Sequence, residues 1–102
     1  MTTKELLTVQ YRFRIIGRGL FLIPENSIVP KDDFERFNET VLVIRPDRTQ
    51  QKYNARFDTQ QFSMGDDGKW TVVLLIEDTA PDEIPEGSQV YGNAETFARL
   101  NG

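Results

Sequence analysis

Cysteine and histidine are both absent from this chain of 102 residues. Without thiols, neither disulfides nor thiolate metal sites can stabilise the fold, so stability must come from burial of the 38% of residues that are hydrophobic. The commonest general base, the thiol nucleophile and most transition-metal ligands are also missing. The sequence therefore predicts a protein that is not an enzyme and that has no cofactor, no catalytic residue and no metal site.

Long apolar runs are lacking as well, and none precedes Val9. We therefore expect neither a signal peptide nor a membrane span, and we expect a cytoplasmic protein without membrane contacts. The lack of disulfides fits a reducing compartment. The length predicts one domain over residues 1–102 with one hydrophobic core.

Positive charge is scarce in the second half of the chain. The net charge is -4; residues 1–57 hold ten Lys and Arg against seven Asp and Glu, whereas residues 58–102 hold two against nine. An acidic chain lacks the electrostatic footprint of a nucleic-acid binder, which disfavours RNA and makes a basic protein the better partner. The alternative is that the two halves pair across strands on a solvated surface.

Alternating apolar residues predict strands. Between Thr8 and Ile15 one side of such a strand carries Val9, Tyr11, Phe13 and Ile15. Gly17-Arg18-Gly19 then marks a corner or bulge that bends the sheet, because glycine accepts a positive φ or a close backbone approach. A second strand over 20–23 ends at Pro24.

Further short strands are expected over 40–44, 53–57, 70–76 and 89–92. Turns are expected at 46–48 and 64–68, long loops over 24–39 and 77–88, and a helical turn or an edge strand over 93–102. We expect Trp70 in the core or at a barrel end. Together these segments predict an all-β protein, a small closed or nearly closed antiparallel β-barrel of about six strands.

The segment Phe13-Arg14-Ile15-Ile16-Gly17-Arg18-Gly19-Leu20 resembles the opening strands of the second domain of translational GTPases, the elongation factor Tu type of β-barrel. A second likeness covers the apolar run 72–76, followed by an acidic turn and glycine over 82–90, where that barrel closes. The resemblance spans roughly residues 8 to 92 and implies a translation-protein barrel as a stand-alone domain. In that family the barrel receives the acceptor end of aminoacyl-tRNA or contacts neighbouring domains and the ribosome.

Two departures limit what the resemblance implies. The phosphate-binding pattern G-x-x-x-x-G-K-[ST] is missing, so GTP hydrolysis is not expected. A long loop over 24–38 replaces the family's short glycine turn, and Arg18 alone maps onto the arginine-bearing turn. This loop is therefore expected to serve a different partner.

Our leading hypothesis is a non-enzymatic binding module whose two long loops face a protein partner. The predicted contact residues are Asp32, Asp33, Phe34, Asp82 and Glu83. Phe34 and Phe37 have the spacing of a short helix that presses both rings inward, with Asp32 or Asp33 as its cap.

The alternative is an RNA-associated or ribosome-associated accessory domain with a basic strand face. Its predicted contacts are Arg14, Arg18, Arg45, Arg48 and Arg56, with Tyr11 or Tyr53 exposed nearby for stacking. The competing interpretation puts the tyrosines in the core and pairs the arginines with Glu39, Asp47 or Asp58.

Adjacent carboxylates occur at Asp32-Asp33, Asp66-Asp67, Glu77-Asp78 and Asp82-Glu83. None has the spacing of a calcium loop, so we interpret them as solvated loop acids. The oligomeric state stays open, because a barrel that fails to close leaves edge strands that pair with another chain.

Overall fold

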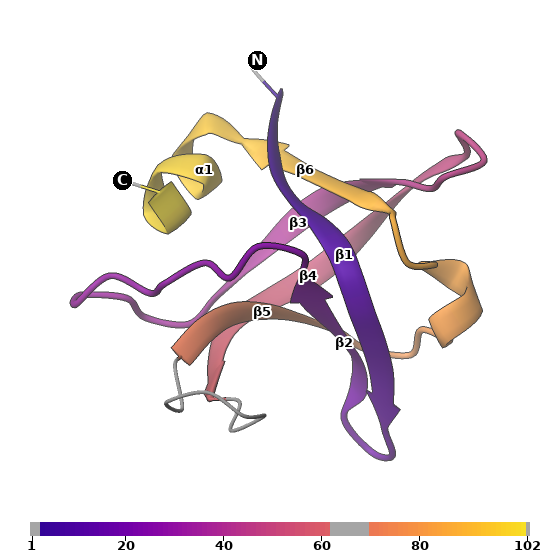
Figure 1. The fold of residues 1–102 in the computed structure, drawn as a ribbon, viewed down its shortest axis with the longest axis horizontal. Coiled ribbons are helices and arrows are strands. Elements are labelled where there is room, and N and C mark those ends of the chain that lie inside the picture. Colours follow the sequence, from indigo (N-terminus) through magenta and orange to yellow (C-terminus); the bar gives the residue numbers. More distant parts are fainter. Residues whose placement is uncertain (1–2, 62–69, 102) are drawn as a thin grey trace.

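Six antiparallel strands close into a barrel in the order β1-β2-β5-β4-β3-β6, which confirms the predicted fold class (Figure 1). The computed structural model describes residues 3–61 and 70–101. The strands are β1 (Thr3–Ile15), β2 (Gly19–Pro24), β3 (Phe37–Ile44), β4 (Gln50–Gln61), β5 (Trp70–Ile76) and β6 (Gln89–Asn93). A short 3₁₀ turn, η1 (Pro81–Glu83), precedes β6, and the helix α1 (Ala94–Asn101) follows it.

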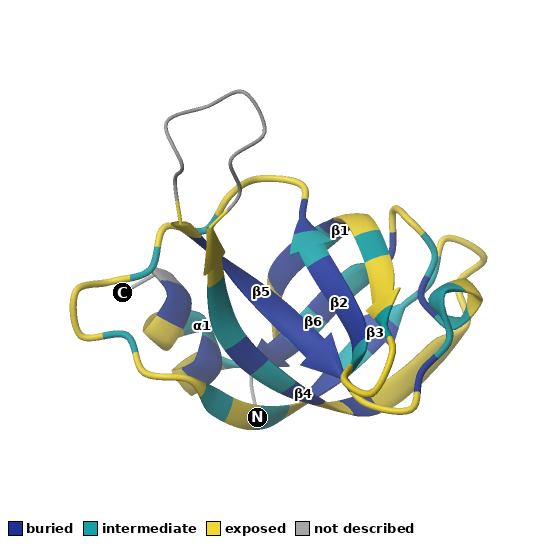
Figure 2. Ribbon diagram, turned by 90° about the horizontal axis from the view of Figure 1, so that it is seen from below, coloured by how far each residue is buried: buried dark blue, intermediate teal, exposed yellow. Residues whose placement is uncertain are grey.

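The core fills the inside of the barrel. Side chains alternate along a strand, so every second residue points inward. The inward set includes Leu20, Leu22, Val41, Val43, Tyr53, Ala55, Phe57, Val72, Leu74 and Ile76, all of them buried (Figure 2). Phe57 is fully buried at the centre, and its ring stacks on that of Phe37 with centroids 4.7 Å apart. The alternation predicted for residues 53–57 is confirmed.

One expectation about β1 is wrong. Val9 pairs with Pro24 of β2, yet Tyr11 pairs with Ile23, so Gln10 is an extra residue that forms a β-bulge. An extra residue reverses the alternation, since a shift by one position turns every later side chain to the other face. Val9 is therefore buried at 1% exposure, whereas Tyr11 is 57% exposed and Phe13 40%.

Other segments differ in their extent. β1 begins at Thr3 rather than Thr8, because its first residues pair with β6. β3 begins at Phe37, which pairs with Phe57, and residues 25–36 form no helix. Of the two places predicted for Trp70, the core is wrong, since it is 51% exposed, and it lies instead at a barrel end, where it opens β5 opposite Gln61, the last residue of β4. The tail forms a helix, and the turn expected at 64–68 lies outside the described residues.

The Gly17-Arg18-Gly19 corner forms the tight turn between β1 and β2. Its two glycines have φ angles of +83° and +120°, and the Arg18 amide donates to the Ile15 carbonyl over 2.9 Å. A Cβ at position 19 would lie 2.7 Å from the backbone oxygen of Ile76 at the end of β5, while one at position 17 would meet nothing within 4 Å. Gly19 therefore permits a close approach of two backbones, and Gly17 only a turn.

We expect the two glycines to respond differently to alanine. Gly17→Ala should lower the free energy of unfolding by about 1 to 2 kcal/mol, the cost of a positive φ. Gly19→Ala adds a collision with backbone that cannot rotate away, so the loss should reach about 3 kcal/mol or more. Urea unfolding of both variants measures the difference, and equal losses would contradict the close approach.

Candidate binding surfaces

The two acidic loops predicted to face one partner lie on different sides of the barrel. Residues 25–36 lie beside α1, whereas residues 77–88, which contain η1, lie on the opposite side of the molecule (Figure 1). In the view turned by 90° they again lie apart (Figure 2). The structure therefore does not bring Asp32 and Asp33 together with Asp82 and Glu83.

The loop over 25–36 combines exposed acids with an anchored ring. Asp32 and Asp33 are exposed, but Phe34 is half-buried against the core, with its ring 6.0 Å from that of Phe37. Lys31 donates from Nζ to the Ala98 carbonyl over 2.8 Å, which ties the loop to α1. Phe34 thus holds the loop in place, and the two aspartates are its accessible groups.

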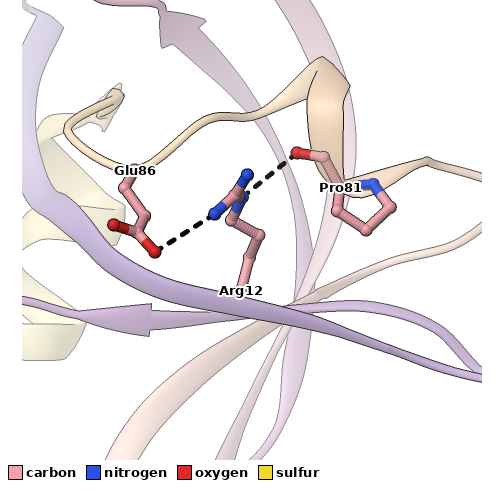
Figure 3. Close-up of polar contacts among 3 residues, drawn as sticks. All are labelled: Arg12, Pro81 and Glu86. Atoms are coloured by element: carbon pink, nitrogen blue, oxygen red, sulfur yellow. Dashed lines mark hydrogen bonds and ion pairs between the residues drawn. The ribbon is translucent and has the colours of Figure 1, made fainter.

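The loop over 77–88 is held by two arginines, one on β1 and one directly after β3. Arg12 of β1 donates from Nε to the Pro81 carbonyl and pairs with the Glu86 carboxylate, each over 3.2 Å (Figure 3). Arg45 donates to the Glu83 carbonyl, and the Glu83 carboxylate accepts the Ala80 amide as a cap of η1. Glu83 therefore has a structural role, while Asp82 is exposed.

Arg45 and Tyr53 form a polar contact at the rim of the barrel. Arg45 donates from Nη2 to the Tyr53 hydroxyl over 2.8 Å and to Gln51 over 2.9 Å. Burial raises the pKa of the Tyr53 phenol above its ordinary value of 10.0, although the Arg45 charge opposes the rise. Because the neutral phenol is favoured in the fold, its stabilising contribution is full below about pH 10 and falls as the pH rises through the raised pKa.

Replacing Tyr53 tests this contact. Tyr53→Phe should lower the free energy of unfolding at pH 7 by about 1 kcal/mol, the loss of one hydrogen bond. It should also remove, from the ultraviolet absorbance, the phenol titration that Tyr53 contributes above its ordinary pKa. Above about pH 10 the wild type should lose stability faster than the variant; parallel stability curves would contradict the raised pKa.

The arginines predicted to bind RNA do not form one stripe. Arg14 and Arg18 lie at the β1–β2 turn, where the Arg18 guanidinium is 5.6 Å from the centroid of the Phe21 ring. Arg45 is engaged with η1, and Arg48 lies in the β3–β4 turn with a φ of 77°. Arg56 is on β4.

The predicted pairing of these arginines with Glu39, Asp47 or Asp58 is not found either. Among the described residues the ion pairs are Arg12–Glu86 and Arg99–Glu95. Asp47 instead accepts hydrogen bonds from the backbone and hydroxyl of Thr49, which lower the pKa of its carboxyl. It therefore stabilises the β3–β4 turn rather than an arginine.

An apolar surface lies on the outside of the barrel, across β1, β2 and β5. We call it the outer face, and its members are Tyr11, Phe13, Ile15, Phe21, Ile23, Val73 and Leu75. The rings of Phe13 and Phe21 stack with centroids 5.5 Å apart and planes 5° from parallel. Phe21, Val73 and Leu75 are buried beneath their neighbours, while Tyr11 and Phe13 are the most exposed members.

Part of this surface has a signal in the sequence. The run 72–76 is apolar at every position, and a strand with one wet face would alternate instead. Continuous apolarity indicates that both faces of β5 are covered, which the burial of Val73 and Leu75 bears out. The contribution of β1 has no such signal, because it depends on the bulge at Gln10.

A basic groove adjoins the outer face, on the outside of β3, β4 and β5. It has a volume of about 620 Å³, and its lining includes Arg36, Asn38, Lys52, Asn54 and Arg56, with Glu77 at the β5 side. None of its three cations forms an ion pair with another residue of 3–61 or 70–101. Arg56 pairs with Leu75, so groove and outer face are continuous.

Two further features of the described residues bear on function. No group of three or more acidic side chains within 3–61 and 70–101 is arranged to hold a metal ion, and the Asp66-Asp67 doublet lies outside these residues. In the same part of the chain, no helix has the length and apolarity needed to cross a membrane.

Comparison with known proteins adds no relative. No family model, no curated protein and no solved structure matches this chain. The likeness to the second domain of translational GTPases therefore stays a prediction from the sequence, and the case for function depends on the surfaces described above.

Proposed function

We propose that this chain is a non-enzymatic binding module that presents the outer face to a partner. The observation that supports this proposal is the exposure of Tyr11 and Phe13, at 57% and 40%, on the outside of a closed barrel. Contiguous apolar surface on a soluble protein marks an interaction site, because leaving such surface in water is unfavourable. Two rings on paired strands also offer rigid contact area at a low cost in side-chain entropy.

The exposed aspartates remain predicted contacts for a basic partner. Asp32 and Asp33 are exposed on the loop 25–36, on one side of the barrel, and Asp82 is exposed on the loop 77–88, on the other side. A partner that contacts both loops must therefore span the barrel. A partner that binds the outer face contacts one continuous surface and does not have to span the barrel.

Affinity capture with matched variants tests the proposal. Phe13→Asp adds a charge to the outer face, while Val29→Asp adds the same charge at a position that is 72% exposed on the distant loop 25–36. We expect the wild type and Val29→Asp to retain the partner. Phe13→Asp should retain at least tenfold less of it, because the new carboxylate must be desolvated in the complex. Equal retention by all three proteins would refute the outer face as the site.

Binding of single-stranded RNA is the second candidate function. The supporting observation is the set of cations Arg36, Lys52 and Arg56, none with an ion pair among the described residues, lining a groove that continues into the aromatic outer face. Cations without ion pairs follow phosphates, and exposed rings on the same sheet surface, here Tyr11 and Phe13 two strands beyond the groove, stack bases. Of the arginines that the sequence predicts to contact RNA, only Arg56 lines this groove.

A salt titration tests this candidate. We expect an oligouridine to bind at about 50 mM salt and to weaken steeply towards about 200 mM, as counterions compete for the phosphates. The charge reversals Lys52→Glu and Arg56→Glu should each reduce the affinity at least tenfold, with Arg48→Glu in the β3–β4 turn as the control. No detectable affinity at the low salt concentration would eliminate RNA binding at this groove.

A further inference from the structure

The described strands close into a barrel, so face-to-face packing, rather than pairing of strand edges, is the way in which these strands can bring two copies of this chain together. Each described strand pairs with a neighbour on both sides. None of these strands is therefore an edge strand that could pair with a second chain, as expected for a barrel that fails to close. The tail that was a candidate edge strand is the helix α1. An apolar sheet face can still pack against another sheet. We propose that the partner of the outer face is a second copy of this chain, related to the first by a two-fold axis.

The order of residues across the strands carries this inference. Phe13 pairs with Phe21, Phe21 with Leu75, and Leu75 with Arg56, so these four side chains form one outward row across β1, β2, β5 and β4. The neighbouring row has Tyr11 paired with Ile23 on one side and Val73 paired with Asp58 on the other. Each row thus begins with an aromatic ring on β1 and ends with a charge on β4.

A two-fold axis that runs along the strands, between β2 and β5, sets each row against the same row of the second copy. Phe13 then faces Arg56 of the second copy, a cation over an aromatic ring. Tyr11 faces Asp58 of the second copy, a hydroxyl donor opposite a carboxylate acceptor. The apolar members of β2 face those of β5. Every contact is chemically matched and occurs twice, as an isologous interface requires.

The charges around the outer face are self-complementary. Arg18 and Arg56 lie at its border together with Asp58, Glu77 and Asp78. Arg18, Glu77 and Asp78 line one hollow at the β1–β2 turn. A border of one sign would repel its own copy, whereas a border of both signs allows opposite charges to meet. A second copy carries the same two signs at its border, so it can meet each charge with an opposite one.

The interface is expected to be small. The outer face spans a few strands that lie about 4.8 Å apart and two full rows, which is at the low end of stable interfaces. Its centre is already packed, since Phe21 and Val73 are 5% and 0% exposed. We therefore expect a reversible dimer with a dissociation constant in the micromolar range rather than an obligate one.

Sedimentation equilibrium over a concentration series tests the proposal. From about 1 µM to about 1 mM, a range that brackets a micromolar dissociation constant, the mean mass should rise from 11.8 kDa towards twice that value. Phe13→Asp and Arg56→Glu should each raise the dissociation constant about 100-fold, because each alters two symmetry-related contacts. Val29→Asp should leave it unchanged. Circular dichroism of each variant verifies that the barrel is folded.

A swap variant tests the geometry itself. In F13R/R56F the ring and the cation exchange places, so the two-fold axis again sets a cation over a ring, and the dissociation constant should return to within about tenfold of the wild type. Circular dichroism again verifies the fold. A folded F13R/R56F that stays monomeric would contradict the axis. A wild type that is monomeric at about 1 mM, or a dimer that persists in folded Phe13→Asp, would overturn the proposal.

This inference rests on the proposed function, and the two can fail separately. If sedimentation shows a monomer while affinity capture still loses a different protein with Phe13→Asp, the second copy is wrong and the binding module stands. If Phe13→Asp changes neither the mass nor the capture, both are wrong. If oligouridine alone binds, the basic groove replaces the outer face as the site.

Discussion

Strand β1 pairs with two different neighbours along its 13 residues. Its first part pairs with β6 and its second part with β2, and the change of partner occurs around Val9 and the bulge at Gln10. There the Val9 amide donates to the Ser88 carbonyl and the Val9 carbonyl accepts the Gly87 amide, each over 2.8 Å. The barrel closes because β1 makes both connections, and the bulge that permits the bend also turns Tyr11 and Phe13 outward.

Two arginines, Arg12 on β1 and Arg45 directly after β3, hold the connection between β5 and β6. Arg12 and Arg45 donate to two carbonyls of the segment around η1, so this connection lies against the barrel although it contributes a single fully buried apolar side chain, Ile84. Planar guanidinium groups suit this role, because they donate in several fixed directions and stay charged at all relevant pH values. The basic first half of the chain therefore contacts the acidic second half, but through backbone carbonyls more than through ion pairs.

The outer face and the basic groove meet where Arg56 pairs with Leu75. One sheet surface thus changes from aromatic on β1 to charged on β4 over the width of four strands. Such a gradient gives a partner both a desolvated contact and an orientation, since the apolar part supplies affinity and the charged edge sets the register. The protein-binding proposal and the RNA candidate use opposite ends of this gradient.

Local patterns in the sequence determined the class of fold. Alternation over 53–57, the apolar run 70–76 and the glycine corner at 17–19 depend on side-chain period and turn chemistry, which neighbouring residues specify, and the barrel bears them out. The two long loops were likewise recognisable from proline and acidic residues, and Asp32, Asp33 and Asp82 are exposed on them.

Only the tertiary structure decided which residues share a surface. The bulge at Gln10 depends on how β1 is divided between β2 and β6, a choice made by partners far away in the sequence. For the same reason the alternation of β1 indicated the wrong face for Tyr11 and Phe13. Arg45 looked like a free cation until the fold brought Glu83 and Tyr53 to it. Residue types and spacings set the strands, whereas the pairing of distant strands set the surfaces that a partner meets.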